Sequence, residues 1–438
     1  MVEVDRKTLL WAASRCASVS SKDPRKITPY IKIACSGGGL WVEGASSVEW
    51  LRVEVGNTDG KWQVIVPAKP IVDILRTKSQ DKVALSCVSK GKQAGQLQVF
   101  CDGAELSVKS LEGDVFPSSE SLDSVVSDGA HISVELGELA RVLSGGSLGA
   151  LAGGSGGKYP EGHFYYSVLI EVIRGAIRAV SSDGKRISVI ESGGQNGIAL
   201  MQRVAGESEG KVEPEVEAMI STESARELAD LATDAVRRSI SGPARLIVTK
   251  RGIRCSIGKI VYQTATVNAS PVNYRSVVAH HSLQVNETVS APAGVLRGAI
   301  NRAHSVAKGL WGEYKEPLGG HTIGMLVERE SITVATLEES STGAKGRFIE
   351  RVAPVNGPDT PSAVFFMPDL LQDALEFVGE YTNVDISYMT TAENGGVRLV
   401  NDTAVIVTTK SENFFYMFMP KTGFSDGYNL AEIFNVGR

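Results

Sequence analysis

Apolar and polar positions along this chain follow two periods, one typical of helices and one typical of strands. Six segments share a short strand pattern followed by apolar residues at i, i+3, i+4 and i+7, which indicates a helix with one buried face. These segments begin near Val2, Val64, Ile132, Met219, Val289 and Val364. Between them apolar residues alternate with polar ones, as in half-buried strands. The pattern predicts six short amphipathic helices among many antiparallel strands.

Turn and proline signals mark where these elements meet. Asp102-Gly103 and Asp183-Gly184 each separate two strand-like runs, and such pairs favour hairpin turns because they tolerate a positive φ. Pro67, Pro292 and Pro368 stand where a strand pattern changes to a helix pattern. Proline is tolerated there because the N–H that it lacks would have no helical partner. Each repeat is therefore expected to contain a strand, a helix and then a strand meander.

Six repeats in 438 residues group most economically into three tandem domains of two repeats each. This number agrees with a soft expectation of about 150 residues per domain. Polar connectors near residues 126 and 283 give the boundaries. We expect an α+β fold with domains at residues 1–126, 127–282 and 283–421, followed by a C-terminal tail at 422–438.

Composition and charge narrow the function classes. Hydrophobic residues make up 42 % of the chain, yet no run approaches the ~20 apolar residues of a membrane helix. No signal peptide is recognisable at the start. The five cysteines are scattered without a CxxC pair, which favours a reducing cytoplasm and argues against structural zinc or a disulfide framework. The net charge is −5, so any DNA contact must come from local basic patches or from shape.

Three short motifs suggest other chemistry, and each has a plainer interpretation. Residues 145–149 and 153–157 match GxSxG, but a nucleophile elbow needs a preceding strand and a following helix. We favour a flexible glycine-rich loop at residues 144–158, and a hydrolase using Ser147 or Ser155 stays a rival hypothesis. Lys158 follows a glycine but lacks the remaining P-loop residues. His280-His281 is interpreted as a solvated pair in a polar connector, because no other metal ligand stands at the required spacing.

Basic residues recur on the polar faces of the predicted helices. They are Lys7, Arg15, Lys69, Arg76, Arg141, Arg226, Arg237, Arg297 and Lys308. A charged face is usually only a solvated one. Six equivalent helices, however, could present these charges to one central polyanion, where contacts to phosphates carry no sequence information. The sixth helix departs from this trend, because Asp369, Asp373 and Glu376 make its polar face acidic.

Several segments resemble the bacterial DNA polymerase III beta subunit, or β sliding clamp, family. Residues 163–191 are similar to the middle-domain signature of that family, with the turn at Ser182–Ile187 as the most specific part. Residues 62–76, 106–120, 273–277 and 414–421 also agree. The resemblance covers about residues 1–421. The low overall identity is that of a divergent member, such as one encoded by a phage or plasmid.

The resemblance implies the DNA clamp fold, with three similar domains each of two βαβββ-like units. In that family two chains close head to tail into a ring, with antiparallel sheets outside and helices lining the hole. The implied function is that of a non-enzymatic processivity factor that encircles double-stranded DNA without reading its sequence. Implied partners are a replicative polymerase, a clamp loader and other proteins with peptides of the Gln-Leu-x-Leu-Phe kind. No cofactor, metal or membrane is expected. The alternative is a clamp-fold module that sequesters such peptides without a role in processivity.

Family site residues transfer to named positions. The resemblance assigns DNA contact to Arg25, Lys158, Tyr159, His163 and Phe164, and the helix-face pattern adds Lys69 and Arg76. It assigns the partner-peptide pocket to Tyr165, Ser182, Gly184, Lys185, Arg186, Ile187, Val277, Met367, Leu370, Met417, Phe418, Met419 and Pro420. Lys185 replaces a usual histidine and Tyr165 a usual leucine, so the peptide preference is open.

The tail at residues 422–438 extends beyond the usual end of the family. Within it, residues 429–434 loosely resemble a clamp-binding peptide. One hypothesis is that the tail folds back and competes for the pocket. The alternative, which we favour, is a tail that is disordered or docked on the surface.

Overall fold

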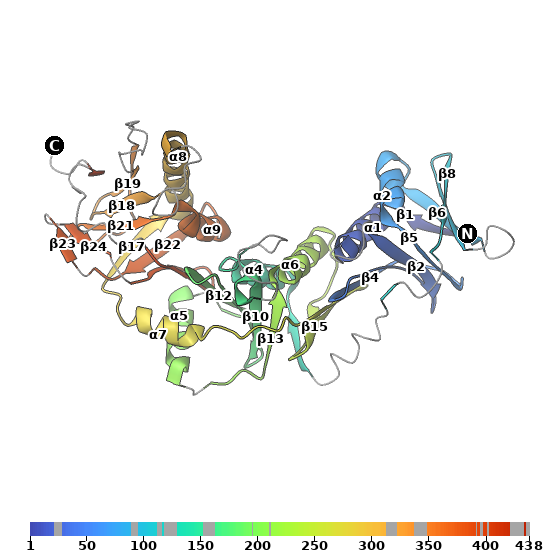
Figure 1. The fold of residues 1–438 in the computed structure, drawn as a ribbon, viewed down its shortest axis with the longest axis horizontal. Helices are drawn as coiled ribbons and strands as arrows, with labels where there is room; N and C mark the ends of the chain where they lie inside the picture. Colours follow the sequence, from blue (N-terminus) through green and yellow to red (C-terminus); the bar gives the residue numbers. More distant parts are fainter. Residues whose placement is uncertain are drawn as a thin grey trace. The chain divides into compact units, whose positions relative to one another are not determined.

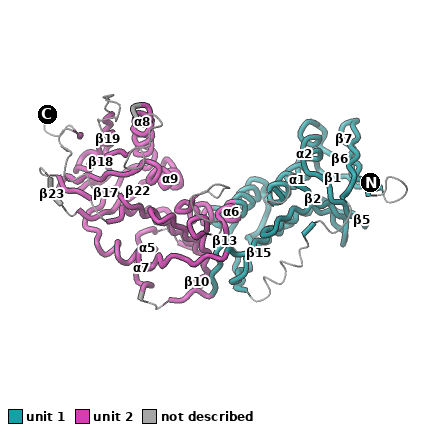
Figure 2. Tube along the Cα trace, viewed as in Figure 1, with its two compact units in different colours: residues 1–140, 216–220, 227–267 teal, residues 141–215, 221–226, 268–438 magenta. Residues whose placement is uncertain are grey.

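The computed structural model describes most of the chain, and the account below concerns those residues only. They are residues 1–21, 29–88, 95–111, 116–117, 129–151, 163–194, 196–209, 212–311, 322–336, 348–390, 392–394, 397–400, 403–420 and 433–434. Contacts between residues divide them into two compact units (Figure 2). Unit 1 comprises residues 1–140, 216–220 and 227–267, and unit 2 comprises residues 141–215, 221–226 and 268–438.

All six predicted helices are present. They are α1 (Arg6–Ser21), α2 (Ala68–Thr77), α4 (Leu136–Gly146), α6 (Thr222–Arg237), α8 (Ala293–Trp311) and α9 (Pro368–Val378), as Figure 1 shows. Two further helices, α5 (Gly197–Gly206) and α7 (Tyr274–Ser282), were not predicted, and short 3₁₀ turns occur at η1 (Phe164–Tyr166) and η2 (Glu207–Glu209). In the described part of the chain, none of the helices is long and apolar enough to cross a bilayer.

Unit 1 contains two antiparallel sheets. One has the strand order β1-β6-β7-β8 and the other β5-β2-β3-β4-β16-β15-β14-β9. The strands are β1 (Val2–Asp5), β2 (Tyr30–Ser36), β3 (Gly39–Ala45), β4 (Glu49–Asn57), β5 (Trp62–Pro67), β6 (Lys82–Val88), β7 (Gln96–Cys101), β8 (Ala104–Lys109), β9 (Ala130–Val134), β14 (Ala244–Thr249), β15 (Gly252–Ile257) and β16 (Ile260–Ala265). Strand β13 (Val216–Ser221) lies almost wholly in this unit.

Helix α1 packs on the second sheet of unit 1 through one apolar stripe. Leu9, Ala13 and Cys16 are fully buried, as the helical period predicted. The helix approaches β3 so closely that a side chain at Gly44 would overlap the carbonyl group of Cys16. This close contact fixes glycine at that position of the strand.

Unit 2 contains the strands that build the candidate site. To one eight-stranded sheet this unit contributes the run β10-β11-β12-β26-β25-β22-β17, and a second sheet runs β20-β19-β18-β21-β24-β23. The strands are β10 (Ser167–Ile173), β11 (Ala176–Ser182), β12 (Arg186–Glu191), β17 (Glu287–Pro292), β18 (Ile323–Val327), β19 (Ile332–Thr336), β20 (Ile349–Val352), β21 (Ser362–Phe366), β22 (Asn383–Tyr388), β23 (Ala392–Asn394), β24 (Val397–Leu399), β25 (Val405–Thr409) and β26 (Phe414–Phe418).

The predicted hairpin signals have two different outcomes. Asp102 and Gly103 both adopt positive φ, 51° and 71°, between β7 and β8, which is the conformation of a type I′ turn. At the second signal only Gly184 has a positive φ, 82°. There the Asp183 side chain holds the loop by accepting hydrogen bonds from the backbone N–H groups of Lys185 and Arg186.

The proline positions agree with the prediction. Pro67 precedes α2, Pro292 ends β17 just before α8, and Pro368 is the first residue of α9. The division into three domains stays a prediction, because the two compact units do not test it.

Candidate functional site

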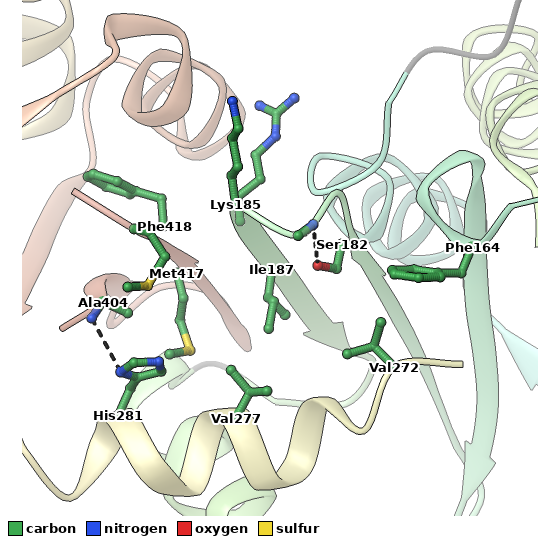
Figure 3. A pocket seen from close by; sticks show the side chains of 13 residues that line it. Phe164, Ser182, Lys185, Ile187, Val272, Val277, His281, Ala404, Met417 and Phe418 are labelled. Atoms are coloured by element: carbon green, nitrogen blue, oxygen red, sulfur yellow. Dashed lines mark hydrogen bonds between the residues drawn. The ribbon is translucent and has the colours of Figure 1, made fainter. Parts of the chain in front are cut away.

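A pocket of about 280 Å³ lies within unit 2 (Figure 3). Its lining residues are Phe164, Ser182, Gly184, Lys185, Arg186, Ile187, Val272, Val277, His281, Ala404, Met417, Phe418 and Met419. Most of these side chains are apolar, and a few polar groups stand among them. This volume lies near the lower end of the range of about 300–1,000 Å³ that is usual for small-molecule sites. It suits a few side chains of a short peptide.

The floor of the pocket is formed by two paired strands. Strand β12 pairs antiparallel with β26, so that Ile187 stands opposite Met417. Directly opposed residues point to the same face of a sheet, and both side chains project toward Val277 on helix α7 (Figure 3). The pairing continues past β26, because the Met419 N–H donates to the Lys185 carbonyl over 2.9 Å. Two segments far apart in sequence therefore present one continuous apolar surface.

The turn between β11 and β12 forms the polar rim. Gly184 is needed there because of its positive φ, and because a Cβ atom would lie 2.5 Å from the Tyr165 hydroxyl. Arg186 donates through Nε to Asp183 over 2.9 Å and through Nη1 to Asp373 of α9 over 2.6 Å. These bonds fix the turn to α9. Lys185 remains exposed and gives the rim a positive charge.

Helix α7 forms the opposite wall, and its start is capped by Asn273, whose side chain accepts from the Ser276 N–H. Val277 and His281 stand one turn apart on the face that lines the pocket. The His281 Nδ1 atom accepts a hydrogen bond from the Ala404 N–H over 3.3 Å. Partial burial lowers the pKa of His281 and the neighbouring His280 lowers it further. A neutral imidazole is what an accepting Nδ1 atom requires.

A buried network of charges holds α7 in place. Arg178 on β11 is fully buried and forms a two-pronged pair with Glu207, over 2.6 and 2.9 Å. From α7, Tyr274 donates to Glu171 over 2.6 Å, and Arg275 donates to Glu171 over 2.8 Å and to Glu207 over 3.2 Å. Buried charges are tolerated when each is paired and hydrogen-bonded.

The network extends to α5 and is balanced in charge. Glu191 accepts from Arg178 over 2.8 Å and from Arg203 of α5 over 2.6 Å. Three arginines thus face three glutamates. Burial alone would raise the pKa of Glu207, but hydrogen bonds from Arg178 and Arg275 bring it below its usual value. The carboxylate therefore stays charged at neutral pH, and the pocket wall is fixed by directional bonds.

Nine of the thirteen predicted pocket residues come together around this cavity. The other four do not line it: Tyr165 packs on the turn at Gly184, and Leu370 and Pro420 are buried elsewhere, while Met367 precedes α9. Four lining residues were not predicted for the pocket, namely Phe164, Val272, His281 and Ala404. Phe164 had been assigned to DNA contact.

The interpretation of His280-His281 as a solvated connector pair is wrong for His281. Residues 274–282 form α7, and His281 lines the pocket, while His280 is exposed. The signal that could have found this helix is the cap residue Asn273 followed by apolar residues at 274, 277 and 278. Helix α5 has the same kind of start, because the Asn196 side chain accepts from the Ala199 N–H.

The predicted DNA-contact residues are only partly described. Arg25, Lys158 and Tyr159 lie outside the described residues. His163 stacks on Phe164, with ring centroids 4.6 Å apart. Lys69 and Arg76 are exposed on α2.

The basic helix faces divide into two groups. Lys7, Arg226, Arg237 and Lys308 are exposed, like the two residues on α2. Arg15, Arg141 and Arg297 instead pair with carboxylates of the chain. Arg15 binds Asp234 over 2.6 Å and Asp230 over 3.2 Å, Arg141 pairs with Glu412, and Arg297 lies 3.4 Å from Glu376. These three are less available to a polyanion than the sequence suggested.

The acidic face of α9 is explained by its surroundings. Asp369 lies 3.6 Å from His304, Asp373 binds Arg186, and Glu376 faces Arg297. Each acidic residue therefore lies near a basic group of the same unit.

The serine and metal hypotheses can be checked in part. Ser147 is buried just after the end of α4, and its hydroxyl donates to the Leu143 carbonyl over 2.6 Å. No strand leads into this serine, so it does not form a nucleophile elbow. Ser155 lies outside the described residues. Within the described ranges, no group of three His, Cys, Asp or Glu side chains is placed to hold a metal ion.

Comparison with known proteins gives results for structure alone. No protein-family model matches the sequence, and no curated protein matches it. A sliding clamp (DNA polymerase III subunit beta) from Pseudomonas aeruginosa, solved bound to griselimycin, superposes with a TM-score of 0.73 at 17 % identity, covering 96 % of this chain and 99 % of that chain.

Clamps from two other bacteria superpose similarly. The DNA polymerase III beta subunit of Thermotoga maritima gives a TM-score of 0.72 at 13 % identity, covering 96 % of this chain and 99 % of that one. The Bacillus subtilis clamp gives 0.71 at 13 % identity, covering 96 % and 98 %. The chain has the bacterial sliding-clamp fold. The expected α+β clamp fold is thereby confirmed, and the low identity agrees with the expected divergence from the clamps of known structure.

Proposed function

We propose that this chain is a non-enzymatic DNA sliding clamp that encircles duplex DNA and tethers a replicative polymerase through the unit 2 pocket. The observation that carries the proposal is the combination of the clamp fold over 96 % of the chain with a preformed apolar pocket at the β12–β26 pair. The buried charge network anchors one wall of the pocket, and the exposed Lys185 and Met419 lie at its surface, where a short peptide could reach it.

The chemistry of the pocket indicates what it would bind. Ile187, Val277 and Met417 offer an apolar floor, and flexible methionine side chains adapt to different apolar partners. The exposed Lys185 adds a positive charge at the rim. We therefore expect peptides with two or more large apolar side chains, and an acidic residue beside them should improve binding.

Contact with DNA would rest on the exposed basic residues of the helices. Lys69 and Arg76 are exposed on α2, where contacts to phosphates would be independent of sequence and sensitive to salt. An acidic chain can still hold DNA in this way, because a ring retains its ligand by topology and needs little affinity.

Two chains would close the ring through the free edges of two sheets. Among the described residues, β8 is the last strand of its sheet in unit 1, and β20 is the last strand of its sheet in unit 2. An unpaired edge is a template for pairing with another chain. Pairing of β8 with the β20 of a second copy would be heterologous and would close after a half turn.

Retention on circular DNA tests the proposal. The protein is incubated with nicked plasmid and a clamp loader, and the complex is isolated by gel filtration and then cut at a single restriction site. A clamp remains with the circle and is released after the cut. Equal retention on circular and linear plasmid would contradict encirclement.

A substitution in the pocket tests the partner site separately. Met419→Ala removes a lining side chain that is 36 % exposed and therefore contributes little to the core. It should weaken binding of a Gln-Leu-x-Leu-Phe peptide, whereas Met389→Ala, outside the lining, should not. Equal affinities of the two variants would remove the pocket assignment.

One observation favours a second candidate, a clamp-fold module that sequesters peptides without acting in processivity. Three of the nine basic helix residues are engaged by carboxylates of the chain, namely Arg15, Arg141 and Arg297. This reduces the charge available for DNA. Sedimentation separates the candidates, because a clamp should be a dimer near micromolar concentration whereas a sequestering module would be a monomer.

A further inference from the structure

The sheet β20-β19-β18-β21-β24-β23 has a second apolar face, and the chain's own C-terminal segment covers it. Eight buried residues form one cluster there: Leu326, Ala335, Ala363, Phe365, Val397, Leu399, Ile433 and Phe434. Six of them come from four strands of the sheet, and the last two come from the tail. The cluster includes no residue of α8 or α9, the two helices of this part of unit 2.

The alternation along the strands shows that this face is distinct from the helix-facing core. Successive side chains of a strand point to opposite faces. In β18, Met325 and Val327 are buried but lie outside the cluster, whereas Leu326 belongs to it. In β21, Phe366 points away from the cluster that contains Phe365. Both faces of the sheet are therefore apolar.

An apolar second face is unusual when compared with a sheet of unit 1. There, β2, β3 and β4 carry a polar row in which Lys32 lies 3.4 Å from Glu43, and Arg52 lies 3.5 Å from Glu43. An antiparallel sheet commonly has one solvated polar face of this kind. An apolar face instead requires a cover, because contiguous exposed apolar surface marks a binding site or an aggregation risk.

Ile433 and Phe434, which cover this face, fit closely against it. Phe434 is 1 % exposed and Ile433 is 6 % exposed. The Phe434 ring lies 6.0 Å from that of Phe365. A Cβ atom at Gly324 would lie 2.8 Å from the Phe434 Cζ atom and 2.8 Å from the Phe365 Cε1 atom. Gly324 thus leaves open the floor on which the ring sits.

This face and the pocket share no residue. Ile433 and Phe434 therefore do not occupy the pocket, contrary to the hypothesis that the tail competes for it. The favoured alternative of a tail docked on the surface agrees with the position of these two residues.

We propose that this face, defined by Gly324, Leu326, Ala335, Ala363, Phe365, Val397 and Leu399, is a second peptide-docking seat with the chain's own Ile433-Phe434 as its ligand. An aliphatic residue followed by an aromatic one is the chemistry that the seat accepts. Tethering gives the segment a high effective concentration, so that the seat is closed to free peptides in the intact chain. The seat belongs to unit 2 alone and does not depend on whether the chain encircles DNA.

The test uses the full chain in which Ile433 and Phe434, the proposed ligand, are both replaced. The double variant Ile433→Ala/Phe434→Ala keeps every strand of the seat and removes its occupant. A labelled peptide of residues 429–438 should bind this variant with one site per chain and should bind the wild-type chain at least about tenfold more weakly, since the tethered segment competes. A peptide with Phe434→Ala should also bind about tenfold more weakly, as expected for loss of one buried aromatic side chain.

We call the Ile433→Ala/Phe434→Ala variant the open chain. Two further substitutions in it show where the labelled peptide binds. Adding Gly324→Val fills the floor of the seat and should abolish binding, whereas adding Met419→Ala changes only the pocket and should leave binding unchanged. Circular dichroism establishes that each variant is folded. Absence of binding to the folded open chain would overturn the proposal, and so would binding that Met419→Ala removes and Gly324→Val does not.

The oligomeric state of the open chain shows whether the tail segment or a second copy of the chain covers the seat. If the seat takes only its own tethered segment, the open chain stays in the same oligomeric state as the wild type, and added peptide does not change it. Higher oligomers of the open chain that the peptide does not dissolve would mean that a second copy covers the face, and this would overturn the assignment of the tail as the ligand.

Discussion

The hydroxyl of Tyr274 donates to Glu171 across 2.6 Å in the interior of unit 2 and accepts from Arg178 across 3.0 Å. One phenol thereby joins the first residue of α7 to two strands, β10 and β11. Burial raises the pKa of Tyr274, so the hydroxyl keeps its proton and remains a donor. This junction is one of the contacts that hold the pocket wall, together with the Arg275 bonds to Glu171 and Glu207.

Tyr274→Phe should therefore loosen α7. The substitution keeps the ring but leaves Glu171 and Arg178 each with one bond fewer in a buried site, which costs about 1–3 kcal/mol of unfolding free energy. Denaturant titration measures this loss. Tyr381→Phe is the matched control, because Tyr381 is fully exposed and should change stability by less than about 0.5 kcal/mol. Equal effects of the two would show that the junction does not stabilise the unit.

Peptide binding at the pocket should weaken as the solution becomes acidic. The pKa of His281 lies below its usual 6.5 because of burial and the nearby His280. A ligand in the pocket buries the ring further and opposes its protonation more strongly. Affinity should be constant above about pH 7 and fall as the pH decreases below about 6.5, when the unbound chain takes up the proton more readily.

Fluorescence titration with a Gln-Leu-x-Leu-Phe peptide between about pH 5.5 and 8 measures this dependence. His281→Gln should flatten the profile, whereas His280→Gln, at an exposed position, should only shift it slightly. A pH profile identical in wild type and His281→Gln would assign the dependence to another group.

Association with DNA should depend on α2. Lys69→Ala and Arg76→Ala each remove one exposed charge, and each phosphate contact contributes a slope of about −0.9 in a plot of log affinity against log salt concentration. The double variant should therefore lower the magnitude of the slope by up to about 1.8, by the same relation. Lys61→Ala, at an exposed loop residue of the same unit, is the control. An unchanged slope in the double variant would exclude α2 from the contact.

Two glycine substitutions should have opposite effects on stability. Gly44→Ala would force α1 away from β3, because the new methyl group overlaps the Cys16 carbonyl, and overpacking of this kind costs about 1–3 kcal/mol. Gly137→Ala meets no atom within 4 Å on α4 and should stabilise by about 0.5–1 kcal/mol, because alanine favours the helix. Thermal denaturation compares both with wild type. A destabilised Gly137→Ala would show that α4 needs flexibility there.

The sequence predicted those elements that can be recognised from neighbouring residues alone. Helices such as α1 and α8 carry long apolar stripes, and the Asp102-Gly103 turn has its characteristic conformation, so period and turn chemistry were sufficient. Helix α7 was missed because it is short and carries several polar residues. Helix α5 is mostly apolar and as long as α2, but it falls outside the sixfold strand–helix pattern on which the prediction rested. Tyr274 is buried and Arg275 is partly buried in a charge network that links distant strands, and no local periodicity reveals such partners.

The part of the pocket that was predicted from the sequence consists of one hairpin turn and the end of one strand. Ser182–Ile187 and Met417–Met419 were identified by resemblance, and they pair side by side. Val272, His281 and Ala404 were missed, because they reach the cavity only through the placement of α7 and the start of β25. The same reason applies to Arg15 and Arg297, whose carboxylate partners come from other helices.

The seat at Gly324 sets an order of events during synthesis. The strands that form it leave the ribosome before Ile433 and Phe434, which follow β24 and β26 in the sequence. Until these two residues follow, any sheet that the strands form has its second apolar face exposed to water. A chain that lacks Ile433 and Phe434 would leave Phe365 exposed, as a site that chaperones and proteases can recognise.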